Sequence, residues 1–214
     1  MYLGIKDCII CEIDKDLSVD KIKKGLSSTT FEVFNFKVID SDILEVEYKW
    51  LDSIKIKDKI VSRKQKTVKS WIYHKINHII VFANSESDVN FFKIKIQNSL
   101  HVIFKDINIF EKWKKDYLNK GLWIADLTNI QIKNNIIPYD DEEMINISIH
   151  HLDFKEINAY LTKRLDSLVS LTFKYNGSNN ITFYLDPKSI ISFPDTIRLN
   201  EMIEVFDEVL NDQK

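Results

Sequence analysis

The chain has 214 residues, a formal net charge of -2 and a composition that is 44% hydrophobic and 29% charged. This balance excludes an intrinsically disordered chain, and the overall charge predicts no general affinity for nucleic acid or for membranes. The sequence contains only 4 glycines and 3 prolines, which favours long regular elements and leaves no glycine-rich phosphate loop.

The first hundred residues predict a sheet with two helices. β-Strands are predicted over residues 2–13, 31–39, 43–56 and 66–83, and apolar residues alternate with polar ones most clearly over 43–51. We expect a bulge at Asp52 and Ser53, a basic loop over 58–65, and pairing of the two long strands around that loop as a hairpin. Serines placed as N-caps predict two helices, over residues 19–24 and 85–100.

The middle of the chain predicts a strand over 101–107 and a helix that starts at Asn108. Asn108 and Glu111 have the spacing of a capping box, and an apolar stripe continues to Leu118. A further strand is expected over 122–132. The segment 133–143 then clusters Asn, Asp, Glu and Pro, which predicts an exposed loop or a domain boundary.

The C-terminal part predicts alternating strands and helices again. Asp153 and Glu156 form a capping box for a helix whose apolar stripe continues to Leu168. The other expected elements are strands over 144–150, 169–175, 181–185 and 189–193, and a last helix after Asp195. The turn residues 176–178 predict a hairpin between the strands that flank them.

The two halves repeat one order of predicted elements, which is strand, helix, three strands, helix. Residues 2–100 and 144–211 both follow it, without a shared sequence motif. This order resembles the half-repeat of the TATA-binding-protein fold, in which two such units join into a saddle-shaped sheet with helices on its back. The resemblance rests on topology and implies no site residues. We therefore expect an α+β protein, mainly antiparallel sheet with helices packed on one face, divided into residues 1–100, 101–143 and 144–214.

The best candidate for a binding surface is a basic stretch that carries aromatic residues. Alternation places Val68, Ser70 and Ile72 on one face of a strand. If that face is the core, Trp71 and Tyr73 stand in solvent among the lysines, which would bind phosphates while the rings stack on bases. The predicted nucleic-acid-binding residues are Lys55, Lys57, Arg63, Lys64, Lys66, Lys69, Trp71, Tyr73 and Lys75.

The sequence also allows the opposite orientation of this strand. Trp71 and Tyr73 would then face the core, and the lysines would only keep an edge of the sheet soluble. The same surface could also contact a protein rather than a nucleic acid. Both alternatives agree with the sequence, because alternation alone does not state which face is buried.

A second alternative is a metal-dependent nuclease. Glu47 and Lys49 lie two residues apart on one face of a predicted strand, which resembles the core of the PD-(D/E)xK nucleases. In that family, acids hold a divalent cation and the lysine positions or activates water. The upstream acid would be Asp14, Asp16 or Asp40, although no Pro-Asp pair precedes the motif.

Other reactive residues predict no strong site. Cys8 and Cys11 lie three apart in a predicted strand and so face opposite sides, which favours two ordinary thiols over a redox or metal pair. His150 and His151, near an acidic run, are a weaker candidate for metal or acid–base chemistry. No signal peptide or membrane-spanning run is present, which predicts a cytoplasmic protein.

We expect a non-enzymatic binding module or accessory subunit. The favoured ligand is nucleic acid, and the rival is a protein partner or a homo-oligomer. We expect no cofactor, metal or membrane. A nuclease is the second rival.

Overall fold

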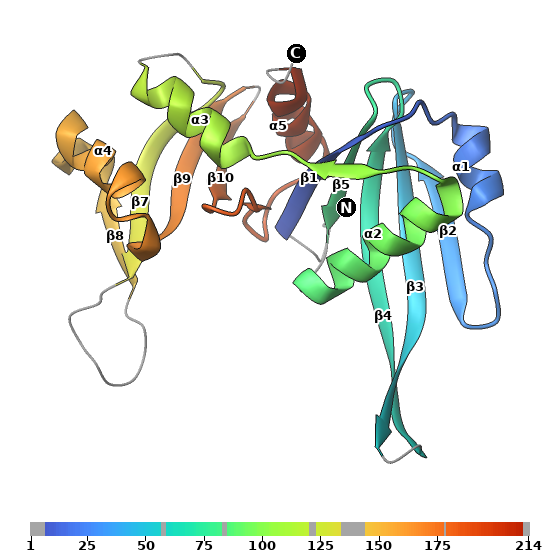
Figure 1. Cartoon of the computed structure of the whole chain (residues 1–214). Helices are drawn as coiled ribbons and strands as arrows, with labels where there is room; N and C mark the ends of the chain where they lie inside the picture. The colour runs from blue at the N-terminus through green and yellow to red at the C-terminus, as the bar shows by residue number, and fades with distance from the viewer. Residues whose placement is uncertain are drawn as a thin grey trace. The chain divides into compact units, whose positions relative to one another are not determined.

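The computed structural model describes residues 7–56, 59–82, 85–119, 123–133, 144–177 and 179–211, and among these it leaves out the side chains of 53–56 and 59–63. The chain divides into two compact units, residues 7–107 and the residues from 108 onward. Each unit is an antiparallel sheet with helices, which confirms the α+β class (Figure 1). Within the described part of the chain, no helix is both long and apolar enough to cross a membrane.

The first unit is a sheet whose strands run in the order β2-β3-β4-β5-β1-β6, antiparallel throughout. The strands are β1 (Asp7–Ile13), β2 (Glu32–Val38), β3 (Ile43–Ile56), β4 (Lys59–Tyr73), β5 (His78–Phe82) and β6 (Phe104–Asp106). The helices are α1 (Val19–Gly25) and α2 (Glu86–Leu100). Ser18 and Ser85 cap the two helices by accepting backbone N–H groups, as the sequence predicts.

Both helices of this unit pack on one face of the sheet. The alternating residues Val46 and Tyr48 of β3 lie in one buried cluster with Ile22 of α1 and with Phe92 and Ile96 of α2. The rings of Tyr48 and Phe92 lie 6.2 Å apart. Burial of this alternate set of side chains is the main stabilising contribution to the unit.

Three predictions about strand boundaries and the bulge in this unit are wrong. Residues 59–65 of the predicted basic loop belong to a strand, because β4 begins at Lys59 and pairs with β3. The predicted strand over 66–83 is interrupted by a turn at residues 74–77, so two strands, β4 and β5, replace one. The register shift lies between Ile54 and Lys55 instead of at 52–53. Pairing with β3 decides these limits, and strand propensity is a weak guide where the partner is unknown.

The second unit has a sheet in the order β8-β7-β9-β10-β11. Its strands are β7 (Asp126–Lys133), β8 (Met144–Ser148), β9 (Leu168–Asn176), β10 (Asn180–Leu185) and β11 (Ile191–Ser192). Its helices are α3 (Ile109–Leu118), α4 (Phe154–Thr162) and α5 (Leu199–Asn211). The helix that Asp153 caps is shorter than expected, because a 3-10 turn follows it and Leu168 already begins β9.

Aromatic contacts place α3 and α5 on the same face of this sheet. Trp113 of α3 meets Phe173 of β9 edge to face at 5.1 Å, and Phe173 stacks on Phe183 of β10 at 5.4 Å. Phe206 of α5 contacts Phe193, which in turn lies 6.1 Å from Phe183. The residues that alternate with Phe173 and Phe183 therefore point to the other face of the sheet.

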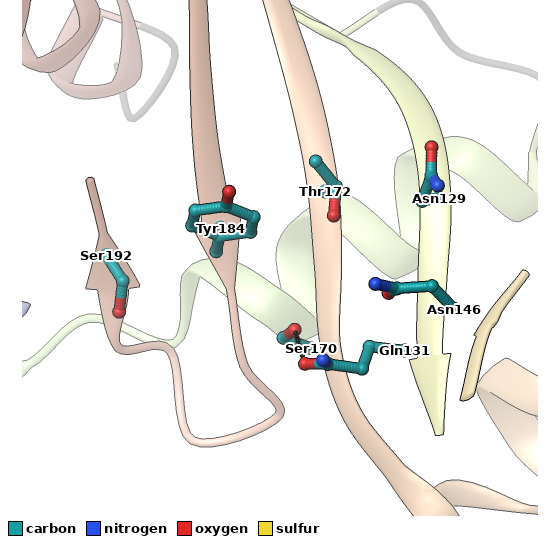
Figure 2. A pocket seen from close by; sticks show the side chains of 7 residues that line it. All are labelled: Asn129, Gln131, Asn146, Ser170, Thr172, Tyr184 and Ser192. Carbon is teal, nitrogen blue, oxygen red and sulfur yellow. Dashed lines mark hydrogen bonds between the residues drawn. The ribbon is translucent and has the colours of Figure 1, made fainter. Parts of the chain in front are cut away.

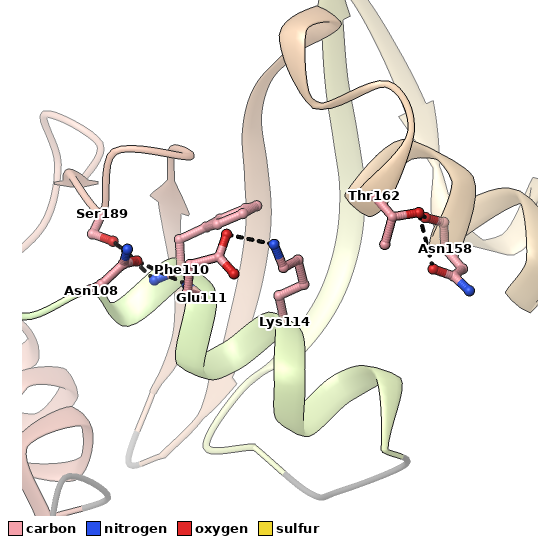
Figure 3. Close-up of polar contacts among 7 residues, drawn as sticks. All are labelled: Asn108, Phe110, Glu111, Lys114, Asn158, Thr162 and Ser189. Atoms are coloured by element: carbon pink, nitrogen blue, oxygen red, sulfur yellow. Dashed lines mark hydrogen bonds and ion pairs between the residues drawn. The ribbon is translucent and has the colours of Figure 1, made fainter.

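A buried serine joins α3 to the turn before β11 (Figure 3). The hydroxyl of Ser189 donates to Asn108 Oδ1 over 2.9 Å and accepts the backbone N–H of Phe110 over 3.0 Å. Ser189 has a φ of 65°, and Asp186 accepts the backbone N–H of Ile190 beside it. The bond to Ser189 satisfies the backbone N–H of Phe110, which has no partner within α3.

The predicted repeat of elements does not hold in full, because four strands separate α1 from α2 and three strands separate α4 from α5. In the first unit, β1 pairs with β5, the last strand of the run that follows α1. In the second unit, β8 pairs with β7, and β11 pairs with β10. The strand that opens each predicted half therefore takes a different place in its sheet.

Candidate functional site

The β3–β4 hairpin extends past its neighbouring strands (Figure 1). β2 pairs with β3 only as far as Trp50, and β5 pairs with β4 only from Lys69 onward. The backbone pairing of β3 with β4 continues to Ile56 and Lys59. We call residues 51–65 the hairpin arm, because within the described residues its two strands pair only with each other.

The arm holds most of the predicted cations. Its sequence has five basic and two acidic residues, a net charge of +3 in a chain whose net charge is -2. Lys64 is exposed to solvent. Lys57 and the side chains of Lys55 and Arg63 lie outside the described residues.

The other predicted lysines lie close to acidic side chains. Lys66, at the base of the arm, pairs with Asp88 at 2.7 Å, and the hydrogen bond that it donates there raises the pKa of its ammonium group. Lys75 pairs with Asp42, and this hydrogen bond is the first cause of the lowered pKa of Asp42. Lys69 is half-buried and lies opposite Glu47 in the β3–β4 register. The nearby carboxylates reduce the attraction of these three lysines for an anion.

Trp71 and Tyr73 do not stand in solvent, so the expectation that they are exposed is wrong. Their exposed fractions are 0% and 5%. The Trp71 ring meets Phe82 edge to face at 4.8 Å, and its indole N–H donates to Glu45 over 3.2 Å. The alternate residue Ile72 is also buried. This part of β4 is buried on both faces, so neither ring is presented to a nucleobase.

Glu47 and Lys49 form an ion pair on the sheet. Their charged atoms lie 2.8 Å apart, and the side chain of Asn35 donates to Glu47 over 3.0 Å. Burial raises the pKa of Glu47, but the hydrogen bonds from Lys49 and Asn35 lower it further, so that it ends below its ordinary value. The carboxylate is thus held in its charged form by partners within the sheet.

The proposed upstream acids have other partners. Asp14 accepts the backbone N–H of Ile103, and Asp16 accepts a hydrogen bond from Asn77. Among the residues that the structure describes, no group of three His, Cys, Asp or Glu side chains is placed to hold a metal ion. No contact therefore favours the nuclease alternative over a structural ion pair.

The two cysteines are separate buried thiols. Neither is in a disulfide. The Cys11 thiol donates to Asp106 over 3.1 Å, and burial followed by this hydrogen bond raises the pKa of Cys11 to about 12. A thiol with this pKa stays protonated at neutral pH and is a poor nucleophile or metal ligand.

A polar hollow of about 520 Å³ lies on the face of the second sheet opposite α3 and α5 (Figure 2). All of the side chains that line it are neutral amides or hydroxyls: Asn129, Gln131, Asn146, Ser170, Thr172, Tyr184 and Ser192. No sequence pattern singles out these residues, because five separate strands contribute them. The available signal is that the outward positions at the hollow carry amides and hydroxyls, although Lys174 lies two residues beyond Thr172 on the same face of β9.

Neither a protein-family model nor a curated protein sequence matches this chain.

Proposed function

We propose that the chain is a non-enzymatic binding module whose hairpin arm binds the phosphate backbone of nucleic acid. The observation that supports this proposal is the coincidence of shape and charge. The basic residues gather on the part of β3 and β4 that lies beyond the other strands of the sheet. A two-stranded β-ribbon fits the major groove of a duplex, and cations on it displace counterions from the phosphates.

Binding by the arm differs from the mode expected from the sequence. Stacking by Trp71 and Tyr73 would favour single strands, but both rings are buried. Contacts with phosphates carry no base-sequence information, and they can be made to a duplex or to a single strand. The arm is therefore proposed as a sequence-independent anchor with strong salt dependence.

The test compares two triple variants that lose the same charge. The arm variant carries Lys55→Gln, Arg63→Gln and Lys64→Gln. The control variant carries the same kind of change on exposed lysines of α1, in the same unit: Lys21→Gln, Lys23→Gln and Lys24→Gln. Fluorescence anisotropy with a labelled 20-base-pair duplex, a length of about two helical turns, is measured over a series of salt concentrations.

We expect the arm variant to reduce the slope of log affinity against log salt by about 2–3, because three phosphate contacts are lost. The control variant should leave the slope nearly unchanged. Equal effects of the two variants would show that only net charge matters, and would contradict the arm as the binding element. Absence of wild-type binding at low salt would also contradict it.

Exposed aromatic side chains support a protein partner as a second candidate function. Phe31 and Phe91 are 62% and 44% exposed. Phe91 stacks on Trp50 at 4.9 Å, and the backbone of Leu51 donates to the carbonyl of Phe31. Exposed apolar patches mark association surfaces, and a second copy of the chain is the simplest partner.

Sedimentation of the wild type and of Phe31→Ser with Phe91→Ser tests this candidate. Self-association of the wild type that the double variant loses would support it. A wild type that sediments as a monomer at every concentration would contradict self-association.

A further inference from the structure

The polar hollow of the second unit is built from two cross-strand rows. Strand register aligns Ser192 with Tyr184, Tyr184 with Thr172, and Thr172 with Asn129. A second row aligns Ser170 with Gln131 and Gln131 with Asn146. Neighbouring strands are about 4.8 Å apart, so the rows form a grid of closely spaced donors and acceptors.

The lining selects for a neutral ligand. No lining side chain is charged, so the hollow offers no ion pair to offset the desolvation of a phosphate, carboxylate or ammonium group. Amides and hydroxyls each donate and accept hydrogen bonds. A matching ligand is therefore uncharged at the point of contact and presents donors and acceptors side by side.

Hydrogen bonding leaves several of these groups available. The Ser170 hydroxyl donates to Gln131 Oε1 over 2.9 Å, which orients this amide and leaves its NH₂ group to donate. Within the described residues, the side-chain amides of Asn129 and Asn146 make no hydrogen bond. Figure 2 shows the side chains of Gln131, Asn146 and Ser170 close together on the sheet.

Tyr184 adds a flat apolar surface to the grid. It is 37% exposed, and it stands between Thr172 and Ser192 on the same sheet face. An aromatic ring on the open face of an antiparallel sheet can stack on an unpaired base, which is how several RNA-binding sheets hold single strands. The hollow volume of about 520 Å³ is also within the range of small-molecule sites.

We propose that the polar hollow binds an unpaired nucleobase, with adenine preferred. A side-chain amide makes a paired donor and acceptor contact with adenine, and Tyr184 stacks on the flat ring. The assignment of nucleic acid as the natural source of the base rests on the proposed function of the arm. The hollow itself lies within the second unit and needs no contact from the arm.

Uncharged nucleosides test the hollow separately from the arm, because they carry no phosphate. Adenosine, cytidine and uridine are titrated at millimolar concentration into the isotope-labelled full chain, and amide NMR shifts are followed. Cellotetraose, a neutral polyol without a planar base, is titrated in parallel. We expect adenosine to shift signals of Gln131, Asn146 and Ser170 more than the other probes do.

Two substitutions at one position separate stacking from folding. Tyr184→Ala should weaken adenosine binding by at least roughly fivefold, because the stacking surface is lost. Tyr184→Phe keeps the ring and should retain the wild-type affinity. Gln131→Ala should reduce the preference for adenosine over uridine, because the paired contact is lost.

The proposal would be overturned if no nucleoside shifts these signals, or if cellotetraose shifts them and nucleosides do not. Equal affinity of Tyr184→Ala and the wild type would also overturn it. Failure of the duplex to bind the arm leaves these nucleoside shifts unaffected, so the two proposals fail separately.

Discussion

Trp71 illustrates what a single residue contributes in the middle strand of the first sheet. Its ring contacts Phe82, and its indole N–H is satisfied by Glu45. Because the side chain is fully buried, its removal leaves a large cavity and an unpaired acceptor. The residue is thus expected to serve stability and not ligand binding.

We expect Trp71→Ala to lower the free energy of unfolding by about 3–5 kcal/mol. Denaturant unfolding measures the loss. Phe31→Ala is the control, because Phe31 is 62% exposed and its loss should change stability by no more than about 0.5 kcal/mol. If both variants unfold at the wild-type midpoint, the burial of Trp71 contributes little to folding.

Glu32 provides a prediction for pH dependence. Burial raises its pKa, but hydrogen bonds from Lys95 and from the Tyr48 hydroxyl lower the pKa further, so that it lies below the ordinary value. A lowered carboxyl pKa stabilises the fold above the unfolded-state pKa, and this stabilisation is lost as the pH falls through the folded-state pKa.

Lys95→Met removes the ammonium group and keeps most of the side-chain packing. We expect this variant to be less stable than the wild type by about 0.5–1 kcal/mol at pH 7. The difference should shrink as the pH falls below the ordinary Glu range, because the wild type then loses the same ion pair. Urea midpoints at a series of pH values measure it, and a difference independent of pH would contradict the role of Glu32.

At the scale of elements, the helix starts follow directly from local chemistry. Asp153 accepts the backbone N–H of Glu156 over 2.8 Å, and the Glu156 side chain accepts the backbone N–H of Asp153 over 2.8 Å. This reciprocal box confirms the predicted start of α4. It involves residues only three positions apart, so the sequence contains all the information that it needs.

We expect Asp153→Ala to destabilise the protein by about 1 kcal/mol, because the backbone N–H of Glu156 in the first turn of α4 loses its acceptor. Lys155→Ala is the matched control, since Lys155 is exposed on the first turn of the same helix. Chemical denaturation compares the two variants. An Asp153→Ala midpoint equal to that of Lys155→Ala would show that the capping box does not limit stability.

At the scale of the whole molecule, the chain has two units, but the acidic segment does not lie between them. The units divide between Ile107 and Asn108. Residues 134–143 lie outside the described residues, and the strands on either side of them, β7 and β8, pair with each other in the second unit. Their protease sensitivity therefore stays a prediction, and a cut there would fall within one sheet.

We expect limited proteolysis with a glutamate-specific protease to cut first at Glu142 or Glu143, because the clustered polar residues predict an exposed loop. The two fragments should remain associated under native conditions, because β7 and β8 stay paired. Mass spectrometry identifies the cut. Glu142→Gln with Glu143→Gln should remove it, and first cleavage elsewhere in the wild type would contradict the exposed loop.

Local sequence patterns are enough to predict the fold class and the positions of most elements. Capping residues such as Ser18, Ser85 and Asp153 act on neighbours within one turn, and alternation in β3 acts along one strand. Both signals are local, so they can be read without knowing the fold. The cluster of cations after Lys55, on which the nucleic-acid proposal depends, is also a local signal.

The buried faces and the contacts between distant residues are visible only in the folded chain. Alternation predicts that Trp71 and Ile72 point to opposite faces of β4. Both faces are buried at this point, and no local pattern indicates this. Tyr184, Thr172 and Asn129 come from three strands and align only through the register of the sheet. Burial and register depend on contacts between residues that are distant in sequence, and for that physical reason the polar hollow emerged only from the folded chain.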